Sequence, residues 1–168
     1  ITNNKLYQPA ELGGGASYKW HNHLLAIEVN NIMWSDAEGY KEFGWEDQTI
    51  FSLGYQLQWG DHFGRLGYVM ADDHPLGNKA IGNDASAANK PRNAMNMLNL
   101  VGFPAIVDSH ITVGYGHKFS DTFTLDLAYT HTPEVTESTK YNAGVGGPMT
   151  IDVAHSQQAV TAEGRWSF

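Results

Sequence analysis

The sequence contains no cysteine, no long apolar run and few positive charges. Without cysteine it can form no disulfide, no zinc–thiolate site and no thiol nucleophile. No stretch approaches the ~18 apolar residues that a membrane-spanning helix needs. Lys and Arg number 10 against 18 Asp and Glu, and the resulting net charge of −8 argues against nucleic acid as a partner. These absences exclude thiol chemistry and a helical membrane protein.

Apolar residues and glycine are well represented. Hydrophobic residues make up 42% of the chain, which excludes a disordered protein by composition. The length of 168 residues allows one domain, and we treat residues 1–168 as a single segment.

Seven segments alternate between apolar and polar residues with the period of two that is typical of β-strands. The clearest is Thr49–Trp59, where large apolar residues occupy every second position. The segments are about as long as the ~9–11 residues with which a tilted strand crosses a bilayer. The predicted strands are Leu12–Trp20, His23–Trp34, Thr49–Trp59, Phe63–Ala71, Ser109–Phe119, Thr122–Thr132 and Gln157–Phe168.

Short and long connections alternate strictly between these strands. Turns of two or three residues lie at His21-Asn22, Gly60-Asp61-His62 and Ser120-Asp121, and they consist of turn-forming residue types. The other connections are long: Ser35–Gln48, Asp72–Asp108 and Pro133–Ser156. Transmembrane β-barrels have this arrangement, with short periplasmic turns and long external loops. The sequence therefore predicts an all-β protein, a transmembrane antiparallel β-barrel.

Aromatic residues gather at the short-turn ends of the strands, as in the interfacial girdle of an outer-membrane barrel. A soluble β-sandwich also alternates, but it gives no reason for all tight turns and an aromatic belt to lie at one end. The girdle residues are Trp20, Trp59, Phe63, Phe119, Phe123, Trp166 and Phe168.

The last strand ends on an aromatic residue, and Trp166 and Phe168 fall on its apolar face. Such an ending resembles the C-terminal strand that the outer-membrane barrel assembly machinery reads, so we predict that these two residues form an assembly signal. The C-terminus is then periplasmic. Seven strands cannot close alone, because open edges would leave unpaired backbone groups in lipid. We therefore expect the C-terminal half of a longer barrel, with the remaining strands supplied by another segment or a second chain.

Several stretches, in this order and spacing, resemble the FadL/TodX family of outer-membrane channels for long-chain fatty acids and aromatic hydrocarbons. The resemblance extends from about Pro9 to Phe168, and the segment Asn99–Ala105 is closer to the hydrocarbon-transporting branch. The stretches are Pro9–Ala16, Trp34-Ser35, Gly54-Tyr55, Arg65–Tyr68, Asp73–Pro75, Asn99–Val107, His110–Gly116 and Leu125–Tyr129.

The resemblance implies a fourteen-stranded barrel with an N-terminal plug, of which this chain holds about seven strands and no plug. It implies a channel in the Gram-negative outer membrane for fatty acids or hydrocarbons, with the lipid bilayer, lipopolysaccharide and a hydrophobic small molecule as partners. The alternative is a structural or interaction barrel in an envelope assembly, without transport.

Charged residues of both signs are predicted on the polar face of the strands, which faces the barrel interior. Arg65 is predicted to form a ladder with Lys118, Asp126, Glu163 and Arg165 across the last four strands. The interpretation from barrel architecture is structural, because interior polar groups must satisfy one another and fix the register. The functional interpretation is a site for a ligand carboxylate, with Arg65 or Arg165 as the cation. The charged residues are Lys19, Glu28, Arg65, Lys118, Asp126, Glu163 and Arg165.

The predicted external loop Asn93–Val107 is unusually apolar. An exposed apolar loop needs a reason, and methionine adapts to varied ligands. The loop either lines an entry groove for a hydrophobic ligand or folds over the barrel mouth and packs against itself. The candidate ligand-binding residues are Met95, Met97, Leu98, Leu100, Val101 and Phe103.

No motif in the chain indicates catalysis. We find no nucleophile elbow, phosphate loop or catalytic carboxylate pair, so we expect no enzyme and no cofactor. The eight histidines lie mostly at turns and strand ends, and we assign no metal site, because His21 and His23 have no evident third ligand.

Overall fold

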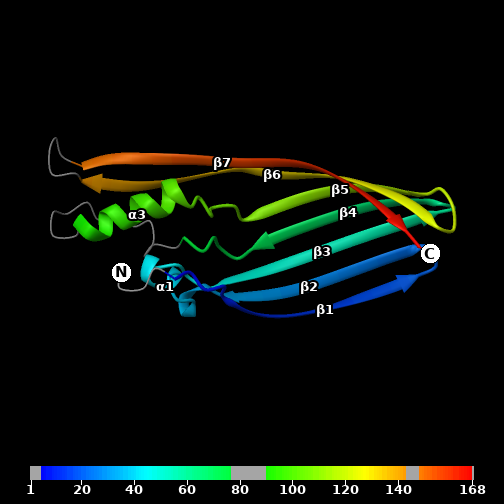
Figure 1. The fold of residues 1–168 in the computed structure, drawn as a ribbon, viewed down its shortest axis with the longest axis horizontal. Coiled ribbons are helices and arrows are strands. Elements are labelled where there is room, and N and C mark those ends of the chain that lie inside the picture. Colours follow the sequence, from blue (N-terminus) through cyan, green and yellow to red (C-terminus); the bar gives the residue numbers. More distant parts are fainter. Residues whose placement is uncertain (1–4, 77–89, 143–147, 168) are drawn as a thin grey trace.

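The structure is a computed structural model that describes residues 5–76, 90–142 and 148–167. Seven antiparallel strands form one sheet in chain order, so each strand pairs with the strand that precedes it and the strand that follows it (Figure 1). The predicted all-β fold is thereby confirmed. The strands are β1 (Ala10–Trp20), β2 (His23–Met33), β3 (Gln48–Trp59), β4 (His62–Ala71), β5 (Ser109–Lys118), β6 (Phe123–Asn142) and β7 (Pro148–Trp166).

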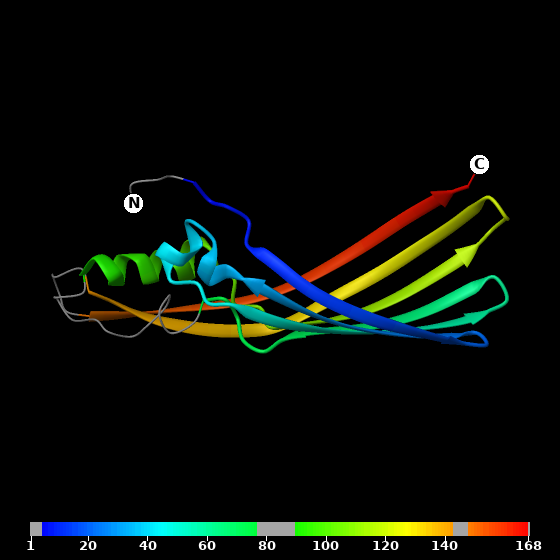
Figure 2. The same cartoon turned by 90° about the horizontal axis from the view of Figure 1, so that it is seen from below.

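All three tight turns lie at one end of the sheet (Figure 1). They join β1 to β2, β3 to β4 and β5 to β6, as the sequence predicts. Gly60 in the second turn has a φ of 58°, in the left-handed region that glycine adopts without a steric penalty. Figure 2 shows the sheet as a twisted trough, with the helices at the opposite end on the side toward which β1 and β7 curve.

The last hairpin is much longer than predicted. We expected a loop over Pro133–Ser156, but β6 continues to Asn142 and β7 begins at Pro148. The register shifts between Thr132 and Val135, as it does at a β-bulge. This shift reverses which residues face each side, so the alternation before Pro133 does not continue in phase beyond it.

One face of the sheet is apolar across all seven strands, and we call it the outer face. A row of register partners crosses the whole sheet, and nearly all of its members are solvent-exposed. An exposed apolar surface of this extent marks contact with another apolar medium or protein. The row consists of Tyr18, Leu25, Tyr55, Leu66, Val113, Tyr129 and Val160.

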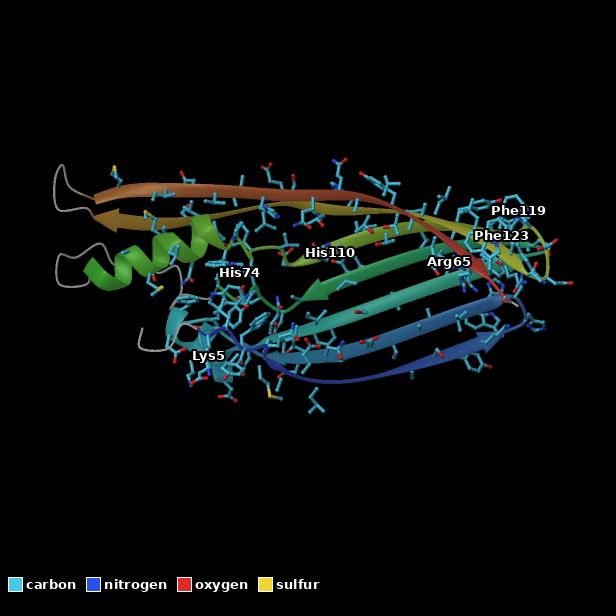
Figure 3. The ribbon with its side chains drawn as sticks, in the orientation of Figure 1. Lys5, Arg65, His74, His110, Phe119 and Phe123 are labelled. Atoms are coloured by element: carbon cyan, nitrogen blue, oxygen red, sulfur yellow. The ribbon has the colours of Figure 1, made fainter. Side chains whose placement is uncertain are left out.

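Aromatic rings stack along the turn end of the sheet, as predicted for a girdle, except that Phe63 lies on the opposite face, where the Arg65 guanidinium is 5.3 Å from its ring centroid. Trp20 stacks on Tyr18 with ring centroids 5.7 Å apart, and Phe123 stacks on Trp166 at 4.8 Å. Figure 3 shows Phe119 and Phe123 at this end, with centroids 5.7 Å apart. Histidines, which the sequence places mostly at turns and strand ends, continue the series between the aromatic rings. Phe168 lies outside the described residues, so only Trp166 of the predicted assembly signal is placed.

The opposite end carries the helices and the packed core. Trp34–Asp36 forms the 3-10 helix η1, Tyr40–Phe43 forms α1, and Lys90–Gly102 forms α3. We predicted a loop over Asn93–Val107. This prediction is wrong for Asn93–Gly102, because these residues belong to α3. Within the described residues, no helix is both long and apolar enough to cross a membrane. The buried apolar cluster consists of Trp45, Leu76, Leu100 and Ile106, with Val135 of β6 and Val153 of β7 packed against it.

Replacing Leu100 with alanine should loosen α3 from the sheet. Leu100 is 0% exposed, and truncation of a buried leucine costs about 2–5 kcal/mol. We expect the amide protons of α3 to exchange faster by a corresponding factor, measured by hydrogen exchange. Leu98→Ala is the matched control, because Leu98 is 45% exposed on the same helix. Equal exchange rates in the two variants would contradict the packing described here.

Candidate functional site

The face opposite the outer face, which we call the inner face, carries the polar residues of each strand. It has several hollows, two of which gather polar side chains of the strands. The first, the helix-end pocket, lies where η1, α1 and the segment after α3 meet the sheet. Its volume is about 370 Å³. It is lined by Trp34, Trp45, Gln48, Pro75, Pro104, Ala105, Val107, His110, His155 and Gln157.

Aromatic packing builds one wall of the helix-end pocket. Trp34, Tyr40 and Trp45 form a triangle with ring centroids 4.7–4.9 Å apart. The indole Nε1 of Trp45 donates to Asn99 Oδ1 of α3 at 3.3 Å, and Asn99 Nδ2 donates to the Phe43 carbonyl at 2.8 Å. Because α3 is tied in this way to the segment between β2 and β3, the indole wall is held in place.

Polar side chains of the strands form the other wall of the helix-end pocket. Gln48 Nε2 donates to the Asp73 carbonyl at 2.8 Å, and His110 Nδ1 lies 2.7 Å from Thr132 Oγ1. His155 Nε2 and Gln157 Nε2, both of β7, are 2.8 Å apart. A pocket with aromatic walls and a few polar groups is suited to a small apolar or aromatic molecule.

The second hollow contains the ion-pair cluster: Arg65, Asp126, Glu163 and Arg165. Its volume is about 490 Å³. Asp126, whose side chain is 14% exposed, accepts from Arg65 Nη1 and, at 2.5 Å, from Arg165 Nη2. Arg165 Nε is also 3.5 Å from Glu163 Oε1. Two cations and two anions therefore balance, and the arrangement cross-links β4, β6 and β7.

Gly116 makes the longest link of the ion-pair cluster possible. Arg65 stands on β4 and Asp126 on β6, with β5 between them. A Cβ at Gly116 would lie 2.2 Å from Asp126 Oδ1 and 3.1 Å from Arg65 Nη1. The ion pair therefore passes over a position that only glycine leaves open.

Of the seven predicted interior charges, four form the ion-pair cluster and Lys118 does not join it. Lys118 Nζ donates to Asp121 Oδ1 in the adjacent turn at 2.6 Å. This hydrogen bond and the nearby positive charge hold the pKa of the Asp121 carboxyl below its ordinary value. On β2, Glu28 accepts from Asn30 Nδ2 at 2.5 Å. Arg65 and Arg165, the predicted cations for a ligand carboxylate, are both engaged by carboxylates of the protein.

The six predicted apolar ligand residues are divided between two sides of α3 and its C-terminal end. Leu100 is buried in the core, whereas Leu98, Val101 and Phe103 are 42–57% exposed. Met95 and Met97 are partly buried. Phe103 stacks on Phe43 with centroids 6.2 Å apart. Leu100 therefore packs against the protein itself, and ligand binding by the exposed residues remains a prediction.

Sequence reasoning missed most of the helix-end pocket. Trp34, Trp45 and His110 stand in segments with no recognisable binding motif, and they meet only because the sheet and the helices bring them together. An available signal was the alternation of Ile151, Val153 and His155 with Asp152 and Ala154, which indicates a strand leading into Gln157. Among residues 5–76, 90–142 and 148–167, no group of three or more His, Asp or Glu side chains is placed to hold a metal ion.

Comparison with known proteins supports the fold. No protein-family model matches the chain, and no curated protein sequence matches it either. It is similar to the crystal structure of the Pseudomonas putida toluene transporter TodX, with a TM-score of 0.60 and 19% identity over 94% of this chain and 34% of TodX. It is also similar to the deltaS2 mutant of the TodX monoaromatic hydrocarbon channel, with a TM-score of 0.57 and 17% identity over 95% of this chain and 36% of that one. The resemblance to FadL/TodX proteins is thus confirmed at the level of fold, and the chain spans about a third of the length of each matched structure.

Gly116→Ala should disrupt the ion-pair cluster. The new methyl group would overlap Asp126 Oδ1, so the carboxylate must move from its arginines or β5 must shift, at a cost of about 1–3 kcal/mol. The free energy of unfolding, measured by denaturant titration, should fall by this amount. Gly54→Ala is the control, because its Cβ would meet only the Ala26 methyl at 3.9 Å. A loss as large in Gly54→Ala would assign the effect to strand glycine in general.

Proposed function

We propose that this chain forms part of the wall of an outer-membrane channel that admits small hydrophobic molecules, with aromatic hydrocarbons favoured over fatty acids. The observation that carries the proposal is the pairing of an apolar outer face with an inner face that holds an aromatic-walled pocket. The outer face suits lipid, and the inner face suits a channel interior. The fold shared with TodX supports this assignment.

The charge balance of the ion-pair cluster distinguishes between the two ligand classes. A fatty acid needs a cation for its carboxylate, as in other protein carboxylate sites. Here Arg65 and Arg165 are both bound to Asp126, and Glu163 supplies a second anion. A neutral hydrocarbon needs no such partner, and the indole wall of the helix-end pocket suits an aromatic ring.

The proposal includes closure of the barrel by further strands. β1 and β7 are the edges of the sheet, and a spanning sheet in lipid must pair its edge groups. We propose that strands outside this chain pair with both edges, giving a barrel of about fourteen strands. The tight turns then lie in the periplasm, where the assembly machinery engages the last strand, and the helix end faces the lipopolysaccharide of the outer leaflet.

A lysine on the outer face should destabilise the protein in lipid. Leu53 is 48% exposed on the outer face, and a lysine at the bilayer midplane costs about 2–4 kcal/mol. Leu53→Lys should lower the free energy of unfolding in lipid vesicles by about that amount. Ser52→Lys is the control, because Ser52 is on the inner face as the register partner of Glu28. If Leu53→Lys were neutral, the outer face would be in water and the channel proposal would fail.

Filling the helix-end pocket should slow uptake. Gln157 lines the pocket, and its neighbour Gln158 points to the opposite face of β7. We expect Gln157→Trp to reduce uptake of radiolabelled toluene by whole cells severalfold, and Gln158→Trp to leave it unchanged. Surface amounts of the two variants are matched by quantifying the folded barrel on gels.

Uptake by cells that produce the original protein tests the proposal of a channel as a whole. Cells that produce the protein should accumulate toluene faster than cells that lack it, and accumulation of oleate should differ less. If neither compound enters faster, the structural or interaction barrel without transport is the better account. If toluene enters faster but Gln157→Trp has no effect, the channel stands and the helix-end pocket is not on its route.

A further inference from the structure

Two histidines of neighbouring strands face each other on the outer face, near the tight turns. His62 of β4 and His117 of β5 are register partners. Their rings stack with centroids 4.5 Å apart, and their Nδ1 atoms are 3.2 Å apart. The Tyr115 hydroxyl oxygen lies 2.6 Å from His62 Nδ1. Two further potential metal donors, His117 Nδ1 and Tyr115 Oη, therefore lie close to His62 Nδ1.

Hydrogen bonds alone do not account well for the two close contacts of His62 Nδ1. A neutral imidazole nitrogen carries either one proton or one lone pair, so His62 Nδ1 can make one linear hydrogen bond, yet it has two close partners. A metal ion with imidazole bonds of about 2.0–2.1 Å and tetrahedral angles places two ligand nitrogens about 3.3 Å apart. The observed 3.2 Å between His62 Nδ1 and His117 Nδ1 is close to that value. Tyr115 Oη, 2.6 Å from His62 Nδ1, must move outward to bind the same ion.

Aromatic neighbours hold both imidazoles in position. The Trp59 ring stacks on His62 with centroids 5.9 Å apart and an interplanar angle of 15°. Phe119 meets His117 edge-on at 4.4 Å. Because both rings are partly buried between these neighbours, little side-chain freedom remains to be lost when an ion binds.

We propose that His62, His117 and Tyr115 bind one divalent transition-metal ion. Imidazole nitrogens suit ions of borderline softness such as Zn²⁺, Cu²⁺ and Ni²⁺, with water completing the coordination. The bound ion joins β4 to β5 at the turn end of the sheet. The site is separate from the helix-end pocket and the ion-pair cluster, so it stands or falls independently of transport.

Calorimetric titration with Zn²⁺ tests the site in the detergent-purified protein without a polyhistidine tag. We expect one ion per chain. His117→Phe and His62→Phe retain an aromatic ring for stacking but remove the donor nitrogen, and each should weaken binding by at least about 100-fold, the upper end of the loss seen when supporting groups of a metal site are removed. Tyr115→Phe should weaken it by about tenfold.

His23→Phe is the matched control for the metal titration. His23 Nδ1 also contacts a tyrosine hydroxyl, Tyr55 Oη at 2.7 Å, but no imidazole of a neighbouring strand faces it within the described residues. This variant should bind Zn²⁺ like the original protein. Heat-modifiable gel migration verifies that every variant is folded.

Three results would overturn the proposal. The first is no binding of Zn²⁺, Cu²⁺ or Ni²⁺ by the original protein. The second is unchanged affinity in folded His117→Phe or His62→Phe. The third is an equal loss in His23→Phe, which would place the ion elsewhere. Unchanged affinity in Tyr115→Phe would overturn the part assigned to the phenol.

Discussion

An apolar sheet face that no part of the described chain covers is the constraint on which the rest of this structure depends. Among the described residues, only five hydrophobic side chains are buried: Ala37, Trp45, Leu76, Leu100 and Ile106. All five lie at the helix end, so most of the sheet has no core of its own. Its backbone ladder is satisfied between strands, but its apolar side chains need an apolar surrounding. Lipid supplies that surrounding only if the edges of the sheet are also paired.

The same constraint explains where the fold could be predicted from the sequence. A strand with one face toward a uniform apolar surrounding shows a period of two, and the starts of β1 to β5 agree with prediction to within two residues. Prediction failed at the helix end, where the sheet packs against a protein core. At Pro133 the bulge exchanges the two faces, so Val135 points to the same side as Thr132, and a strict alternation cannot include both. In α3, Leu100 packs inward and Leu98 outward, a helical distribution that a short apolar run does not reveal.

The ion-pair cluster shows a different limit of sequence reasoning. Alternation placed Arg65, Asp126, Glu163 and Arg165 on one face, and the structure brings these four together. Alternation alone did not show that Arg65 reaches Asp126 directly, across the intervening strand β5. That reach requires the absence of a side chain at Gly116, and glycine within a strand pattern is equally typical of a bulge or a tight bend. Lys118 was predicted on the same face, but it pairs with a nearer carboxylate in the adjacent turn.

Alternation predicted neither α3 nor the extended hairpin of β6 and β7, and these two elements pack together as one unit. The extended part of β6 and β7 provides Val135 and Val153, against which the core of α3 packs. Without that extension α3 would lose part of the apolar surface that it covers. Without α3 the extended hairpin would stand alone, which is marginal for two strands in water. The helix-end pocket lies where this unit meets the segment between β2 and β3, since His155 comes from the former and Trp34 and Trp45 from the latter. The pocket therefore depends on long-range packing at the one end of the sheet that has a protein core.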